Sequence, residues 1–255
     1  EGFLARAAAY VVQRVGSLSA FCVICDRPHV FAGGGMMFPS VCSRELCTFR
    51  FNELQVARDM ATSVAIQTGV IDLMVNIAIA ASKSSRWEII FNPFPEVPAA
   101  DGRSMALGGD KKDIDKVKAI FETLPAMADI SGADSCGDLK AKLDKGSPLA
   151  YPLFQWIVTS NKAHILKMPA SKRIDMMGTK HQYMLTTAAP DRQARFAELK
   201  AKHGVLWAFH GSRAENWHSI MRNGLKNASG TKLQVNGSAY GQGIYLSQAA
   251  STSFN

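Results

Sequence analysis

The residues best suited to hold a small molecule lie near the end of this 255-residue chain. His210, Gly211 and Ser212 directly follow the apolar run 205–209, which Gly204 precedes. A short apolar run bounded by glycine predicts a buried strand. Because a helix is predicted to follow, the three residues would lie where a strand ends and a helix begins. Backbone N–H groups converge at such a junction, and ligands often bind there.

The helix that would position these residues is predicted from its two ends. Ser212 and Glu215 have the spacing of a capping box. Gly224 can supply the left-handed residue that closes a helix. A second strand is predicted over 243–247, after a glycine-rich turn. The apolar residues at helical spacing between these ends are Trp217, Ile220 and Met221.

In this order and at this spacing, the residues resemble the donor half of the catalytic domain of PARP-type ADP-ribosyltransferases. Each residue taken singly has a structural explanation, since His210 could cap a strand and the glycines could form turns. That explanation does not account for the ordered set. The resemblance rests on His210-Gly211-Ser212, Asn216, Gly224-Leu225, Tyr240-Gly-x-Gly-Ile-Tyr245 and Ser251-x-Ser253.

The resemblance implies the cleavage of NAD. Nicotinamide leaves its ribose as a neutral ring while positive charge develops on the sugar, as in glycoside hydrolysis. The enzyme must therefore hold the amide rigidly and leave the opposite face of the sugar open to an acceptor. By resemblance, the backbone of Gly211 grips the nicotinamide carboxamide and Ser253 adds a hydroxyl group to the same amide. His210 can donate to a ribose hydroxyl group, and Tyr245 supplies an aromatic wall.

The resemblance also assigns the adenosine side of NAD. Ser212 and Asn216 match positions that contact it, and Lys226 falls where the family often has a basic residue near the pyrophosphate. The expected reaction is transfer of ADP-ribose from NAD to protein side chains, with release of nicotinamide. The expected catalytic residues are His210 and Tyr245, and the expected NAD-binding residues are His210, Gly211, Ser212, Asn216, Lys226, Tyr245 and Ser253.

Two residues of the family pattern have no match in the sequence. A tyrosine that stacks on nicotinamide should come shortly after Ser253, and the third member of the His–Tyr–Glu triad should lie further downstream. We therefore expect an internal piece of a longer protein, with the C-terminal half of the catalytic domain missing and no activity on its own. The alternative to an enzyme is a catalytically inactive, PARP-like interaction module.

Four of the five cysteines form two close pairs, Cys22 with Cys25 and Cys42 with Cys47. Zinc takes four tetrahedral ligands, and two close thiol pairs separated by a loop are typical of a structural zinc site. The second pair is spaced more widely than usual, and His29 is an alternative ligand. Buried free thiols remain an alternative, as do disulfides, which a cytosolic or nuclear chain would not keep.

The cysteine-rich stretch also resembles the region found ahead of the catalytic domain in one mono-ADP-ribosylating PARP subgroup. Transfer of a single ADP-ribose is expected on this ground alone, because the triad glutamate that helps decide between single transfer and chain building is not in the sequence. The remaining cysteine, Cys136, is expected to be structural.

Composition narrows the function classes further. The chain is 47% apolar, which is ordinary for a globular protein, and no run of about 18 apolar residues predicts a membrane span. The net charge is +8, but the basic residues are scattered. This pattern favours a solvated surface over nucleic-acid binding, with attraction of an anionic dinucleotide or acidic partner as the next interpretation. We expect NAD and protein acceptors as partners and an intracellular location, cytoplasmic or nuclear.

Other chemistries lack their motifs. Leu246 stands where a Rossmann fingerprint would need its third glycine, and the sequence holds no Walker lysine motif, no H-E-x-x-H and no G-x-S-x-G. Four histidines lack ligand spacing and are expected to be ordinary core or surface residues: His164, His181, His203 and His218.

The fold class predicted from these patterns is α+β. A cysteine-rich region with helices (1–98) and a helical linker or subdomain (99–149) precede the N-terminal half of a mixed-sheet transferase domain (150–255). Helices are expected over 53–82 (split at Gly69), 111–124, 138–143, 151–160 and from Pro190 to just before Gly204. Strands are expected over 87–98, where a Pro-rich exit follows, and 181–187, with a loop over 99–110.

Overall fold

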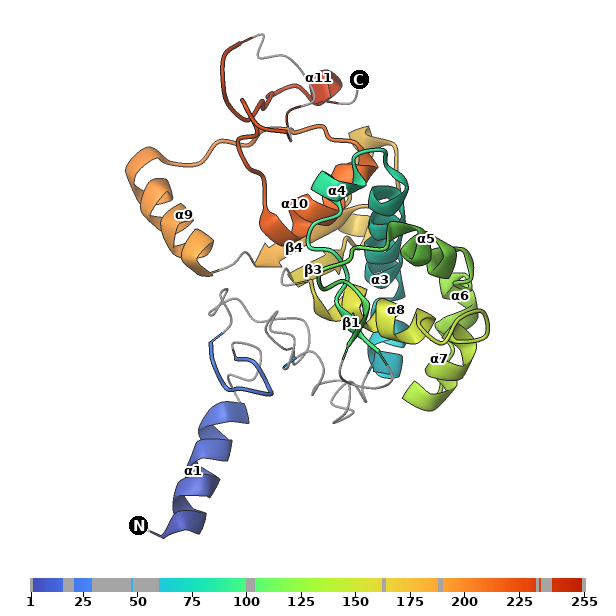
Figure 1. Ribbon diagram of the computed structural model, residues 1–255. Helices are drawn as coiled ribbons and strands as arrows, with labels where there is room; N and C mark the ends of the chain where they lie inside the picture. Colours follow the sequence, from blue (N-terminus) through green and yellow to red (C-terminus); the bar gives the residue numbers. More distant parts are fainter. Residues whose placement is uncertain are drawn as a thin grey trace.

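The computed structural model describes residues 2–15, 21–28, 47, 60–99, 104–161, 164–187, 190–232, 234 and 240–253. These residues are mainly helical, with two short antiparallel strand pairs, as expected for the α+β class (Figure 1). The strands are β1 (Val97–Pro98), β2 (Met105–Leu107), β3 (His164–Lys167) and β4 (Tyr183–Thr187). The helices are α1 (Phe3–Val15), α3 (Met60–Lys83), α4 (Trp87–Ile90), α5 (Ile114–Glu122), α6 (Met127–Ile130), α7 (Cys136–Leu143), α8 (Ala150–Thr159), α9 (Pro190–His203), α10 (Trp217–Asn223) and α11 (Ala250–Ser253). Three single 3-10 turns complete the set: η3 (Ala170–Lys172), η4 (Asp175–Met177) and η5 (Ala214–Asn216).

Helix α3 is the centre of the core. It contacts α5, α6, α7 and α8, and it also contacts β3, η5 and α10 (Figure 1). Its sequence is apolar on nearly every side, which is the pattern of a helix surrounded by other elements. The apolar stretch from Val70 to Ala81 lies in this core, with Ile71, Met74 and Ala78 almost fully buried. None of the described helices has the length and apolar content needed to cross a membrane.

Local sequence rules predict several of the surrounding helices well. Helix α5 starts after Asp113, whose carboxylate accepts a hydrogen bond from the Lys116 N–H at 2.9 Å. Helix α7 is capped in the same way by Ser135, which accepts from the Asp138 N–H at 3.1 Å. Helix α9 begins at Pro190 and ends before Gly204, where φ is +75°, as predicted.

The expected strand over 87–98 is wrong in its first part. Residues 87–90 form the helical turn α4, which buries Ile90 and brings the next residue, Phe91, into the core. The apolar run is too short for its period to distinguish a strand from a helical turn. The expected loop over 99–110 instead contains β2, which pairs with β1.

The predicted split of this segment into two helices is confirmed, with the break two residues earlier than expected. Two helical stretches meet within α3 at a kink at Gln67, where φ is −121° and ψ is 27°. A Cβ atom at residue 69 would lie 3.0 Å from the Cδ atom of Lys167 on β3. The hydroxyl of Tyr183, on the paired strand β4, donates to the Gly69 carbonyl at 2.9 Å. The β3–β4 hairpin therefore lies close to α3 at this position, with the flexible end of the Lys167 side chain facing residue 69.

The core draws on residues from all three expected ranges. Ile71 on α3, Ile120 on α5 and Phe154 on α8 belong to one buried cluster. The packing of this cluster does not test the division of the chain into the ranges 1–98, 99–149 and 150–255. That division stays a prediction.

Candidate functional site

The segment that leads into His210 differs from its prediction. Phe209 and Ser247 exchange two backbone hydrogen bonds, of 2.7 and 3.0 Å, and form an isolated antiparallel bridge. Residues 205–208 and 243–246 form no strand, and the side chain of Trp207 is 89% exposed. The two predicted strands are thus reduced to one bridge, because an apolar run becomes a buried strand only where neighbouring strands pair with it.

The bridge brings His210 beside Tyr245. The Nδ1 atom of His210 lies 3.0 Å from the backbone carbonyl oxygen of Tyr245. A carbonyl oxygen can only accept, so Nδ1 carries the hydrogen in this contact and Nε2 is left for another partner. The His210 ring is half-buried, and its orientation is fixed from one side.

Gly211 lies directly against Ser253. A Cβ atom at residue 211 would overlap the carbonyl oxygen of Ser253 and lie 3.0 Å from its carbonyl carbon. Backbone atoms cannot move aside as a flexible side chain can, so only glycine fits without a shift of the chain. The two residues assigned by resemblance to one amide are therefore neighbours.

Ser212 is held by Asn216, the last residue of η5, and by Trp217, the first residue of α10, and the predicted capping box is wrong. The Nδ2 atom of Asn216 donates to the Ser212 hydroxyl at 3.0 Å, and the indole Nε1–H of Trp217 donates to the Ser212 carbonyl at 3.2 Å. A 3-10 turn, η5, intervenes before α10 starts at Trp217, and neither has a side-chain cap. The Ser212 hydroxyl bonds with a side chain four residues ahead rather than with the backbone N–H of a helix.

Tyr245 closes the glycine-rich turn through its hydroxyl group. That group donates to the Gly241 carbonyl at 2.6 Å and accepts from the Tyr240 N–H at 3.0 Å. Gly241 has a φ of +90°, which glycine adopts readily. The rings of Tyr240 and Tyr245 lie 6.0 Å apart between centroids, so a second aromatic side chain borders the predicted wall. The ring of Tyr245 remains 43% exposed and can receive a flat ligand.

The remaining predicted NAD residue, Lys226, is exposed and follows the closing glycine of α10, Gly224, whose φ is +76°. The interactions found within the described part of the chain do not join Lys226 to His210. The structure thus connects His210 with Tyr245, Gly211 with Ser253, and Ser212 with Asn216, while Lys226 lies apart from these contacts.

Three of the four predicted zinc ligands come together. The Sγ atoms of Cys22, Cys25 and Cys47 lie within 4.8 Å of one another. Cys42 and the alternative ligand His29 lie outside the described residues. Three converging thiols are soft ligands of the kind that zinc prefers.

The turn that carries the first cysteine pair is held in place by its own hydrogen bond, by Arg14 and by contacts with the core. Asp26 adopts a φ of +56°, and its N–H donates to the Cys22 carbonyl at 2.8 Å. The guanidinium of Arg14 on α1 bonds both carboxylate oxygens of Asp26 at 2.8 Å, and it lies 3.5 Å from the centroid of the Phe21 ring. The Arg14 hydrogen bond is the main cause that lowers the pKa of the Asp26 carboxyl. Val23 and Ile24, between the cysteines, pack against the core.

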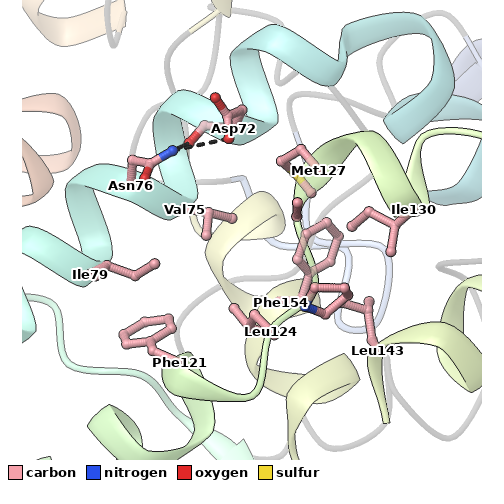
Figure 2. Close-up of a pocket in the computed structure, with 12 residues that line it drawn as sticks. Asp72, Val75, Asn76, Ile79, Phe121, Leu124, Met127, Ile130, Leu143 and Phe154 are labelled. Carbon is pink, nitrogen blue, oxygen red and sulfur yellow. Dashed lines mark hydrogen bonds between the residues drawn. The ribbon is translucent and has the colours of Figure 1, made fainter. Parts of the chain in front are cut away.

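A cavity of about 130 Å³ lies elsewhere, between α3, α5, α6, α7 and α8 (Figure 2). Its walls are mostly apolar, with Phe121, Ile130 and Phe154 among them. The polar side chains at its edge are Asp72 and Asn76, and the Asn76 amide donates to the Asp72 carboxylate at 3.0 Å (Figure 2). Its volume of about 130 Å³ is well below the roughly 300–1,000 Å³ of pockets that hold small-molecule ligands, so this cavity is too small for NAD and the contacts around His210 define the candidate site.

Sequence reasoning missed the two side chains that α10 buries most deeply. The predicted apolar face of α10 is half-buried, whereas His218 and Arg222 are buried. Four-residue spacing is a normal signature of one helix face, but polar residues at that spacing are usually exposed.

Comparison with known proteins adds to this geometry. Residues 172–255 match the family described as the poly(ADP-ribose) polymerase catalytic domain. Protein mono-ADP-ribosyltransferase PARP8 is 41% identical over 255 residues, in Mus musculus and in Homo sapiens, covering 100% of this chain and 30% of each relative. The chain thus spans less than a third of these relatives.

A second relative extends the comparison. Protein mono-ADP-ribosyltransferase PARP16 of Homo sapiens is 29% identical over 189 residues, covering 69% of this chain and 51% of that protein. The catalytic-domain match, the identity along the whole chain and the clustered His-Gly-Ser and Tyr residues agree: residues 172–255 belong to the PARP catalytic-domain family, and the chain as a whole is similar to PARP8.

Proposed function

We propose that the protein containing this chain cleaves NAD, releases nicotinamide and transfers ADP-ribose to a side chain of a protein acceptor. The single observation that carries the proposal is the cluster around residue 210. His210 bonds to the Tyr245 backbone, and Gly211 lies against Ser253, although more than 30 residues separate the members of each pair. A fold that only needed turns at these positions would have no reason to bring these residue types together.

The amide end of NAD would lie on Gly211 and Ser253. A glycine backbone offers an N–H and a C=O without a side chain above them, so a flat carboxamide can bond in both directions. The hydroxyl group of Ser253 lies on a residue already in contact with Gly211. Holding the amide rigidly fixes the direction in which nicotinamide leaves, which is the main geometric demand of this reaction.

His210 would fix a ribose. Its Nδ1–H is directed at the Tyr245 carbonyl, which leaves Nε2 to bond to a ribose hydroxyl group. The half-exposed ring of Tyr245 would form the wall of the nicotinamide subsite.

The adenosine end would extend towards the start of α10. Ser212 and Asn216 are already bonded to each other, so their polar groups are held in place before a ligand binds. Lys226 would add positive charge near the pyrophosphate. Oriented groups of this kind reduce the ordering cost of binding.

Transfer of a single ADP-ribose is the form of the reaction that we propose. Its support is that PARP8 and PARP16 are each named as protein mono-ADP-ribosyltransferases, and that the cysteine-rich stretch resembles one such subgroup. The length of the product is a direct test of this part, because chain building would give a ladder of products.

The proposal can be tested by incubating the full-length protein with labelled NAD. We expect one label per modified site and free nicotinamide in equal amount. His210→Ala should lower incorporation about a hundredfold through misplacement of the sugar, at an unchanged melting temperature. His181→Ala, at an exposed position on the β3–β4 side, is the matched control. Absence of incorporation by the wild-type protein would favour the inactive interaction module.

We also propose that the cysteine cluster holds one structural zinc ion. Cys22, Cys25 and Cys47 supply three thiolates, and Cys42 is the proposed fourth ligand. The bound ion would fix the turn that places Val23 and Ile24 on the core. Zinc ligation contributes directly to folding energy, so loss of the ion should destabilise this region.

Elemental analysis of purified protein should find one zinc per chain. Cys22→Ser should abolish it, whereas Cys136→Ser, outside the cluster, should keep it. Protein without zinc whose four thiols all titrate freely would rule out the metal site. This outcome is independent of NAD turnover.

A further inference from the structure

Two buried polar residues lie on the helix that follows the His-Gly-Ser segment. Helix α10 lies next to α4 and against α3 (Figure 1). The side chain of His218 is completely buried and Arg222 is 7% exposed. Burial of a charged or polar group is costly unless its hydrogen bonds are satisfied, so both side chains require an explanation.

Arg222 is bonded to the end of α8. Its Nη2 donates to the Ile157 carbonyl at 3.1 Å and its Nε donates to the Ser160 hydroxyl at 3.2 Å. Its third bond, from Nη1 to the His218 carbonyl at 3.2 Å, stays within α10. Ile157 is in the last turn of α8, where carbonyl groups lack helical partners and carry partial negative charge.

The charge of Arg222 is therefore balanced by a helix end. Across the described residues no ion pair links it to a carboxylate. Burial lowers the pKa of Arg222 to about 9, which still leaves the guanidinium protonated at neutral pH. Its planar face also lies 5.6 Å from the centroid of the Trp156 ring on α8.

His218 is bonded to a second distant segment. Its Nε2–H donates to the Pro93 carbonyl at 2.9 Å, which assigns the hydrogen to Nε2 and leaves Nδ1 as a buried acceptor without a partner among the described residues. The ring stacks on Trp156 at 6.2 Å and contacts Phe91 at 4.6 Å between centroids. Asn223, at the end of α10, donates to the adjacent Asn92 carbonyl at 2.9 Å.

The other end of α10 holds the His-Gly-Ser segment. Trp217 and Asn216 bond to the carbonyl and the hydroxyl of Ser212, respectively. Ser212 is the next residue after Gly211, which lies against Ser253. A continuous series of bonds thus runs from α8 and the 92–93 segment, through α10, to the backbone that would hold the nicotinamide amide.

We propose that His218 and Arg222 are positioning residues for NAD, which fix α10 on the core and thereby set where the His210–Ser212 backbone lies. The inference rests on the proposed NAD chemistry. Loosening α10 should chiefly raise KM for NAD, because the affected contacts hold the bound dinucleotide. A purely structural pair would lower stability and leave KM unchanged.

The test uses the full-length protein with substitutions at both positions. Arg222→Met removes three donors, whereas Arg222→Lys keeps the charge and one bond to a carbonyl. His218→Phe keeps the ring, whereas His218→Gln keeps a donor near the Pro93 carbonyl. Leu139→Ala is the matched control, because Leu139 is fully buried on α7 and its truncation destabilises the core without a bond to α10.

We expect Arg222→Met and His218→Phe to raise KM for NAD about tenfold, with a smaller change in kcat, because the weakened contacts hold NAD in the ground state as well as in the transition state. The Lys and Gln variants should recover part of this loss. Leu139→Ala should lower the melting temperature at an unchanged KM. Equal KM values for all folded variants would overturn the inference.

A second measurement separates this inference from the proposed function. Hydrogen–deuterium exchange of the full-length protein reports on the 209–217 segment without any need for turnover. Arg222→Met should speed exchange in that segment and not in α7, and Leu139→Ala should do the reverse. If the wild-type protein does not use NAD, the proposed function fails, while unchanged exchange at 209–217 in Arg222→Met would refute the positioning role itself.

Discussion

Single residues of the site are constrained by backbone contacts as much as by side-chain chemistry. Gly211 is the sharpest case, because the carbonyl group of Ser253 occupies the place of a side chain at that position. His210 is similar, since the partner of Nδ1 decides what Nε2 can do. The residue types were predictable from the sequence, whereas these contacts depend on segments far along the chain.

Gly211→Ala should therefore abolish NAD use. The added methyl group forces the 211 backbone away from Ser253, and we expect a loss of about a hundredfold or more in kcat/KM. The melting temperature should change little, because residue 211 is exposed. Gly132→Ala is the control, since no atom lies within 4 Å of a Cβ at that turn position. Retention of activity in Gly211→Ala would contradict the amide-clamp role.

His218 should make stability depend on pH in the acid range. Burial, aided by the charge of Arg222, lowers the pKa of His218 well below its usual 6.5, and its other neighbours, Phe91 and Trp156, do not titrate. Below pH 6.5 the unfolded chain binds a proton that the folded chain does not, so acid favours unfolding.

The contribution of His218 to the free energy of unfolding should thus be highest above pH 6.5. It should fall as the pH drops below 6.5, by up to about 1.4 kcal/mol per pH unit. His218→Gln should flatten this part of the profile, measured by denaturant unfolding between pH 7 and 5. His181→Gln, at an exposed position, should leave the profile unchanged. An identical slope in His218→Gln and wild type would show that another group is responsible.

Elements were predictable from sequence where their cause is local. The apolar spacing over 111–124, the proline at residue 190 and the apolar residues of 53–82 all act over a few residues, and the helices expected there are present. The errors arose where the cause is distant. Residues 87–90 form a helical turn instead of a strand, and residues 205–208 have no strand partner among the described residues.

The same distinction between local and distant causes explains which parts of the candidate site could be predicted from the sequence. The residue set around His210 was recognisable because its order and spacing are a linear pattern. The burial of His218 and Arg222 was not, because their partners lie 125 and 65 residues away, at Pro93 and Ile157. A polar pair on one helix face predicts an exposed surface until those partners are known.

Helix α3 offers a direct test of how Gly69 is used. The atoms that a Cβ would meet are the far end of the flexible Lys167 side chain, which is exposed and can swing away. Gly69→Ala should therefore stabilise the protein by about 0.5–1 kcal/mol through helix propensity. Gly108→Ala should destabilise it, because φ there is +88° and the Pro95 carbonyl oxygen lies 2.5 Å from the Cβ position. Destabilisation by Gly69→Ala would instead show that the Lys167 side chain cannot move aside and that the glycine is needed for this contact.

At the scale of the whole molecule, one buried cluster joins elements that the sequence suggested were separate. Residues of α3, α5, α7 and α8 share it, and α10 is bonded to its edge. We therefore expect residues 60–253 to unfold in one cooperative transition. In calorimetry the van't Hoff and calorimetric enthalpies of that transition should agree. Two resolved transitions, only one of which shifts in Leu139→Ala, would indicate independent units instead.

The bonding of Arg222 to the last turn of α8 has a consequence for building hybrid proteins. Suppose that the helical region that precedes α10 is exchanged for that of a relative, with the junction between α8 and α10. The exchange would then separate the buried guanidinium of Arg222 from the end of α8, whose carbonyl groups balance its charge. The transplanted piece would need to include the 92–93 segment, α8 and α10 together. The pieces of this protein that can be exchanged as units are thus set by the contacts of the buried Arg222 charge. A junction chosen from the catalytic-family match alone, which begins at residue 172, would separate α8 from α10 and so remove those contacts.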